Sequence, residues 1–150
     1  MQILVYITIF AFAAIAYVAA HEGGHYLSAA ACRLNPRFFF AWDVWEIAGC
    51  EVKTPMFGVK HDDTDKDWQN RLIGNMGFGG AAWVGFLLIV LQWKLSPFLS
   101  KYALFRWFDW SFLISYALVF CGHHFIYPFK KKGSPTNDYN RTDADEDPMT

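Results

Sequence analysis

Residues 3–20, ILVYITIFAFAAIAYVAA, lead directly into His21-Glu22-Gly23-Gly24-His25. The first stretch is eighteen residues long and carries no charge, which is typical of a helix that crosses the hydrocarbon layer of a membrane. Residues four apart on a helix share one face, so His21 and His25 would point to the same side with Glu22 close by. The pattern His-Glu-x-x-His on a helix is characteristic of zinc hydrolases. This part of the chain therefore predicts a helix that carries a metal site within a membrane.

Each residue of this pattern has a chemical role in a zinc hydrolase. His21 and His25 would supply nitrogen ligands to zinc, and Glu22 would act as the general base that activates water for attack on a peptide carbonyl. Two histidines alone do not complete such a site, because catalytic zinc takes three protein ligands. The alternative is that both histidines merely extend toward the membrane interface from the end of a helix.

The composition agrees with a membrane protein. Of the 150 residues, 54% are hydrophobic and 19% are aromatic, and the apolar residues form long blocks instead of an amphipathic pattern. The formal net charge of −1 gives no reason to expect nucleic acid as a partner. Three cysteines are an odd number, and they lack metal-ligand spacing. Neither a disulfide framework nor a thiolate zinc site is expected.

We expect a mainly α membrane protein with a small interfacial β element between the first and second spans. The three predicted spans cover about residues 3–32, 72–93 and 109–127. Together with the loop 33–71, the spans form a membrane domain that covers residues 1–129. A disordered polar tail is expected to follow at residues 130–150. A cleaved signal peptide is the alternative for the first span, but residues 1–20 hold no Lys or Arg for a basic n-region.

Positive charge is distributed unevenly between the two sides of this multi-pass arrangement. The loop 33–71 and the tail lie on one side and hold ten of the thirteen Lys and Arg, whereas Lys94, Lys101 and Arg106 lie on the other. Because cytoplasmic loops of membrane proteins are enriched in Lys and Arg, we expect the loop and the tail to face the cytoplasm.

The loop contains a candidate for the β element. Residues 37–47, RFFFAWDVWEI, are aromatic and β-branched with partial alternation, which predicts one or two strands at the membrane interface. Val52 and residues 57–59 would continue the sheet, and Gly49 and the pair Thr54-Pro55 are expected to mark turns. An extended strand near the metal would be a template for pairing with an unfolded substrate segment. A surface hairpin with aromatic membrane anchors is an equal alternative.

The second span opens with a glycine-rich segment. Gly77, Ala81 and Gly85 recur every four residues and give a smooth face that lets another helix approach closely. Asn75 stands near the start of this span, where its amide would bind a substrate backbone or an oxyanion. A helix cap is the alternative role for Asn75.

Together, the His-Glu-x-x-His helix, the aromatic strand region and the Gly-rich, Asn-containing start of the second span resemble the catalytic core of the site-2 protease family of intramembrane zinc metalloproteases. The resemblance covers about residues 10–127. It implies an endopeptidase with a zinc cofactor that acts, within the lipid bilayer, on membrane-spanning or membrane-proximal segments of a protein or peptide. The family's third ligand is an aspartate in a Leu-Asp-Gly motif, which maps onto Asp109, here flanked by Phe108 and Trp110.

His123 or His124 is the alternative third ligand. A straight third span would start on the membrane face opposite the end of the first span. Asp109 would then reach the zinc only if the connector 94–108 returned into the protein, which a break at Ser96-Pro97 would permit. Asp109 and His123 are fourteen residues apart, about 21 Å along a helix, so both cannot bind one ion unless the helix breaks.

Other functional classes stay open at this point. The chain could be a non-catalytic metal-binding membrane adaptor of the same fold, or a membrane haem protein with His25 and His123 as axial ligands. The haem alternative leaves Glu22 without a role. An oligomer or a partner membrane protein that completes the site is compatible with either class.

Overall fold

The computed structural model describes residues 2–47, 49–99, 101 and 103–126, with the backbone alone at 47, 99, 103–109 and 126. Among these residues the chain is mostly helical, with three helices and one small two-stranded sheet. The elements are α1 (Gln2–Ala31), β1 (Arg37–Ile47), β2 (Cys50–Lys60), α2 (Asp67–Leu99) and α3 (Ala103–Ile126). The mainly helical architecture with an inserted β element is thus confirmed. The predicted tail, 130–150, and the predicted end of the third span at 127 lie outside the described residues.

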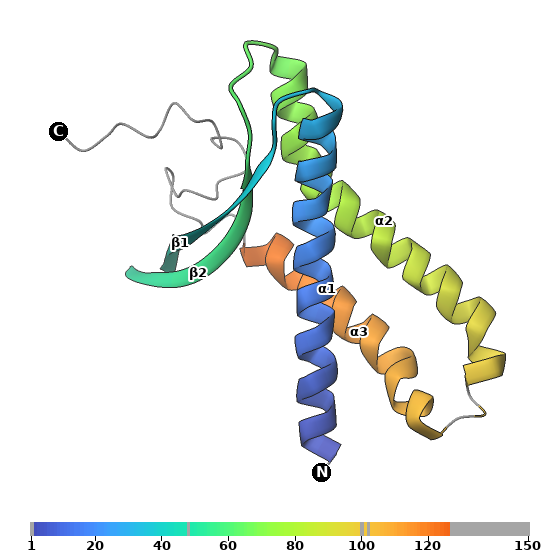
Figure 1. Ribbon diagram of the computed structural model, residues 1–150. Helices are drawn as coiled ribbons and strands as arrows, with labels where there is room; N and C mark the ends of the chain where they lie inside the picture. Colours follow the sequence, from blue (N-terminus) through green and yellow to red (C-terminus); the bar gives the residue numbers. More distant parts are fainter. Residues whose placement is uncertain (1, 48, 100, 102, 127–150) are drawn as a thin grey trace.

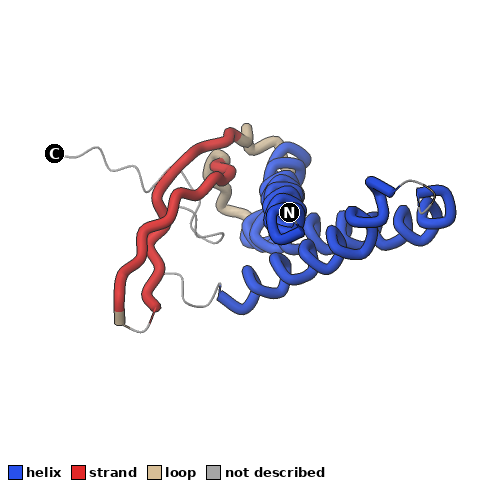
Figure 2. Tube along the Cα trace, turned by 90° about the horizontal axis from the view of Figure 1, so that it is seen from below, coloured by secondary structure: helices blue, strands red, loops and turns tan. Residues whose placement is uncertain are grey.

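The helices run back and forth along the molecule (Figure 1). The start of α2 lies beside the end of α1, and α3 returns from the far end of α2 so that its last turns reach the middle of α1. Seen from below, the hairpin lies on one side of α1 and most of α2 lies on the other, while α3 crosses past α1 so that its end lies on the hairpin's side (Figure 2). This path brings segments from all three helices together near residue 21.

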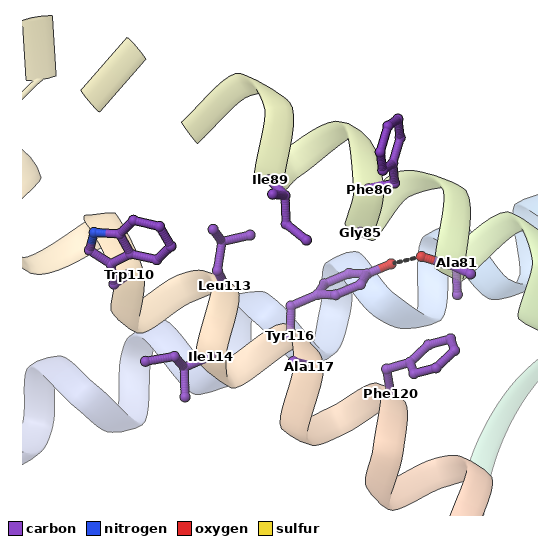
Figure 3. Close-up of a pocket in the computed structure, with 11 residues that line it drawn as sticks. Ala81, Gly85, Phe86, Ile89, Trp110, Leu113, Ile114, Tyr116, Ala117 and Phe120 are labelled. Carbon is purple, nitrogen blue, oxygen red and sulfur yellow. Dashed lines mark hydrogen bonds between the residues drawn. The ribbon is translucent and has the colours of Figure 1, made fainter. Parts of the chain in front are cut away.

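The three helices share a small core. Ala13 and Tyr17 of α1 pack with Ala81 of α2 and Tyr116 of α3. The Tyr116 hydroxyl donates a hydrogen bond of 2.8 Å to the Ala81 carbonyl and so joins α3 to α2 (Figure 3). An apolar groove of about 520 Å³ lies between these two helices next to that bond. The packing leaves most of the apolar surface of the helices on the outside.

Glycines allow α1 and α2 to approach each other closely. A Cβ atom on Gly24 would collide with the Met76 carbonyl, and one on Gly80 would lie 2.9 Å from the Ala20 carbonyl oxygen. Gly77 and Ala81 of the predicted smooth face also meet α1, where Ala81 is fully buried. Gly85 faces α3, where a Cβ would lie 3.2 Å from the Tyr116 ring. Close helix packing is therefore the structural role of this face.

The adjacent glycines of α1 give a matched pair of variants. We expect Gly24→Ala to lower the free energy of unfolding by about 1–3 kcal/mol, because the added methyl group must displace backbone of α2. Gly23 has nothing within 4 Å of an added Cβ, so Gly23→Ala should stabilise the helix by about 0.5–1 kcal/mol through its better helix propensity. Thermal unfolding in detergent measures both variants, and equal melting temperatures would contradict this packing.

The predicted strands form an antiparallel hairpin whose register runs from Arg37 opposite Lys60 to Ile47 opposite Cys50. Gly49 has a φ of 79° and lies in the turn, as expected. The turn expected at Thr54-Pro55 is wrong, because Pro55 lies within β2 opposite Trp42. A two-stranded sheet has an open edge on each strand, and proline is tolerated at such an edge because it needs no hydrogen-bond acceptor there.

α1 matches its predicted span to within one residue at each end, whereas α2 extends beyond its predicted span at both ends and α3 begins earlier than predicted. Polar residues that hydropathy assigns to the loop cap the start of α2: the Lys66 amide donates to Thr64 Oγ1 at 3.2 Å, and Asp67 lies in the first turn. At the other end, α2 passes Pro97 and stops at Leu99, and α3 begins at Ala103. The break expected at Ser96-Pro97 is therefore absent from the described chain, and the connector is much shorter than 94–108.

Candidate metal centre

α1 carries the predicted motif on its buried face, about two thirds of the way along the helix. The exposed fractions of His21, Glu22 and His25 are 3%, 3% and 1%. Three polar or charged side chains so deeply buried need compensating interactions, since removing a charge from water without a partner is costly. The burial of three such side chains within one turn of α1 makes this turn the candidate site.

The ligand atoms of this group converge. The Nε2 atoms of His21 and His25 are 3.3 Å apart, and a carboxylate oxygen of Glu22 completes a group whose three ligand atoms all lie within 4.8 Å of one another. Nitrogen ligands at about 2.0–2.1 Å from a tetrahedral zinc ion are separated by roughly 3.3 Å. The spacing of the two imidazole nitrogens therefore fits a single metal ion, and the described residues can hold one here.

A backbone group of α2 orients His25. The Nδ1 atom of His25 lies 2.7 Å from the carbonyl oxygen of Ile73. Because a carbonyl oxygen only accepts hydrogen bonds, Nδ1 carries the proton and Nε2 keeps the lone pair that a metal requires. A histidine ligand whose other nitrogen donates to a carbonyl is a common feature of metal sites, where it fixes the ring orientation.

Gly77 of α2 lies directly against the two imidazoles. A Cβ atom at this position would overlap His25 Nε2 and lie 2.8 Å from His21 Cε1. The absence of a side chain at Gly77 thus provides the space in which the two rings meet. The same glycine that allows α1 and α2 to pack closely also keeps the histidine nitrogens clear.

The last turns of α3 approach this group from another direction. The ring centroid of His123 is 5.0 Å from that of His21, and Tyr17 Oη is 2.6 Å from His123 Nδ1. Phe78 of α2 packs between the helices, with its ring 4.9 Å from His21 and 5.3 Å from His123. His124 contacts Phe78 and is exposed. Of the two alternative ligands in α3, His123 is the one in contact with the motif.

The remaining predicted site residues lie elsewhere. Asn75 is exposed, and its neighbours Ile73 and Gly77 face α1, so Asn75 occupies the other side of α2. The backbone of Asp109 belongs to the same unbroken helix as His123, about 21 Å away along its axis. The side chain of Asp109 lies outside the described residues.

Sequence reasoning missed three contributors to this site. These are Tyr17, the Ile73 carbonyl and the ring of Phe78. A signal for Tyr17 was present, because it precedes His21 by four residues and so shares the face of the motif. No comparable signal exists for Ile73 and Phe78, because their positions depend on how α2 is rotated against α1.

Comparisons with protein-family models, curated proteins and solved structures give no match for this chain. The protein is therefore defined by its architecture and its site: a mostly helical chain with two long apolar helices and a buried His-Glu-His group able to hold a metal ion. Nitrogen and carboxylate donors suit zinc and other first-row divalent metals.

Proposed function

We propose that this protein is a membrane-embedded zinc endopeptidase that cleaves membrane-spanning or membrane-proximal segments of protein or peptide substrates. The observation that carries the proposal is the 3.3 Å separation of the Nε2 atoms of His21 and His25, with the buried Glu22 carboxylate beside them. This arrangement supports a metallohydrolase, because it combines metal ligands with a carboxylate placed to act as a base.

The outer surface of the helices supports a location in the membrane. α1 and α2 are long and apolar enough to span a bilayer. Large side chains along both are exposed, among them Ile3 at 76% and Trp93 at 72%. Such surfaces are unfavourable in water and favourable in lipid. We propose three spans, with α3 as the third, and a cytoplasmic location for the hairpin loop and the tail.

The residues of the site would divide the work of peptide hydrolysis. Zinc, when bound, would polarise the scissile carbonyl and make a water molecule more acidic. Glu22 would accept a proton from that water and pass it to the leaving amine. Ile73 would keep His25 in its ligating orientation through the hydrogen bond from Nδ1. Phe78 would cover His21 and exclude bulk water from the reacting groups.

Substrates would reach this site from the bilayer. Peptide bonds in a membrane-spanning helix are shielded by the helix's own hydrogen bonds, so a substrate segment would have to unwind before cleavage. Within the described residues, β1 and β2 pair only with each other, and the outer edge of the hairpin would offer hydrogen bonds to an unwound segment.

Two alternatives make different predictions. A non-catalytic adaptor of the same fold would keep the metal but would show no cleavage. The haem alternative conflicts with the packing, because His21 lies against both His25 and His123, with ring centroids 4.9 and 5.0 Å away. A porphyrin between the two proposed axial ligands would require the space that these rings fill.

Metal dependence tests the proposal directly. We expect the purified protein, reconstituted with a membrane-anchored model peptide, to contain about one zinc ion per chain and to cut the peptide within or beside its apolar segment. Treatment with a zinc chelator should stop cleavage, and added zinc should restore it, because the reaction requires the metal bound to the protein. Mass spectrometry of the products and metal analysis provide the measurements. Cleavage that persists after complete removal of the metal would show that the proposal is wrong.

A further inference from the structure

We infer that His123 is the third protein ligand of this metal and that Tyr17 holds it in place. The inference rests on the metal site of the proposed function, but it does not depend on proteolysis. It assigns a site of three histidines, His21, His25 and His123, which two helices contribute. Glu22 then serves as the carboxylate beside the ion and not as a ligand.

Ring spacing is the first argument. The rings of His21 and His25, whose Nε2 atoms are only 3.3 Å apart, have centroids separated by 4.9 Å. His123 stands at nearly the same distance from His21, 5.0 Å between centroids, with an interplanar angle of 64°. Imidazoles around one tetrahedral ion are inclined to each other and closely spaced, as the His21–His25 pair already is. His123 therefore lies beside the converged group of His21, Glu22 and His25 and is placed to approach the same ion.

The hydrogen bond to Tyr17 is the second argument. Tyr17 is 2% exposed, and its hydroxyl oxygen lies 2.6 Å from His123 Nδ1. When this oxygen accepts the Nδ1 proton, Nε2 of His123 keeps a lone pair, just as the Ile73 carbonyl determines the tautomer of His25. Tyr17 also stacks on His21, with ring centroids 5.8 Å apart. One tyrosine thus positions rings from α1 and α3.

Helix geometry is the third argument. α3 is one continuous helix from Ala103 to Ile126. The backbone of Asp109 therefore lies about 21 Å from that of His123 along the helix axis. Since His123 is in contact with His21, α3 would have to break or slide by several turns before Asp109 could replace it. Charge agrees with the histidine assignment. Three neutral imidazoles leave a doubly charged ion, which would stabilise the carboxylate of Glu22 at its 3% exposure.

Metal affinity measured without any substrate tests the assignment. Cobalt(II) replaces zinc in such sites and reports its ligands by absorbance. We expect His123→Ala to weaken cobalt and zinc binding, measured by competition with a chelator, by at least about 100-fold and to change the cobalt spectrum. Tyr17→Phe should weaken binding by about 10-fold, which is typical when the partner of a ligating histidine is lost.

His124→Ala is the matched control, because His124 is exposed and its ring contacts those of Phe78 and Phe120. Its affinity and spectrum should equal those of the wild type, and circular dichroism should show the same helix content in all variants. Wild-type affinity and an unchanged spectrum in His123→Ala would overturn the inference, and so would their loss in Asp109→Ala alone. A protein that binds cobalt through His123 yet cleaves nothing would contradict the proposed function while the ligand assignment stands.

Discussion

Replacing Glu22 with glutamine is expected to lower the rate of proteolysis by about 10²–10⁴-fold, the usual contribution of a general base, while zinc content stays at the wild-type level. Glutamine has the size of glutamate, so it fills the same buried position on α1. Its amide cannot accept the proton of the attacking water. Single-turnover cleavage of the membrane-anchored peptide gives the rate, and metal analysis of the same preparation gives the occupancy.

Two further variants delimit this result. Glu46→Gln removes an exposed carboxylate on the hairpin and should leave cleavage unchanged. His25→Ala removes a proposed metal ligand and should abolish both cleavage and metal binding. If Glu22→Gln cleaves as fast as the wild type, Glu22 is not the base and the endopeptidase proposal loses its catalytic group. If neither the wild type nor Glu22→Gln cleaves the peptide but both bind zinc, the adaptor alternative is favoured.

Replacing Gly77 with alanine should strongly weaken metal binding and also lower the stability of the protein. The added methyl group would occupy the position of His25 Nε2 and crowd His21 Cε1, so the two ligands could not approach one ion. We expect metal affinity to fall by about 100-fold, the upper end of the range for disturbing the surroundings of a ligand. We also expect a loss of about 1–3 kcal/mol of stability from overpacking. Chelator competition and thermal unfolding measure these two effects.

Gly79→Ala is the control for this substitution. Gly79 is on the same helix, two residues away, and an added Cβ there meets only the flexible Met76 Sδ at 3.7 Å. We expect wild-type metal affinity and a slight gain in stability, since alanine is the better helix former. Equal metal binding by both alanine variants would show that the space at Gly77 is not required by the site.

Local features of the chain were predictable. The helix that carries His21 and His25, the strands around residues 37–47 and the turn at Gly49 follow from composition and spacing over a few residues. The ends of α2 were not predictable, because hydropathy identifies the apolar part of a helix and misses a polar first turn capped by Thr64. The strand position of Pro55 was not predictable either, since it depends on the sheet having only two strands.

The sequence by itself determined that His21 and His25 would share one face of an apolar helix with Glu22 close by, because a four-residue spacing and a long uncharged stretch act locally. For the third ligand in the last helix it offered Asp109, with His123 or His124 as the alternative. Only the tertiary structure placed His123 against Tyr17 and His21, and Ile73 and Gly77 against His25. That arrangement depends on the close approach of α1 and α2 at Gly24 and on the continuity of α3. Both are properties of how helices pack on one another, and no single segment of the chain contains them.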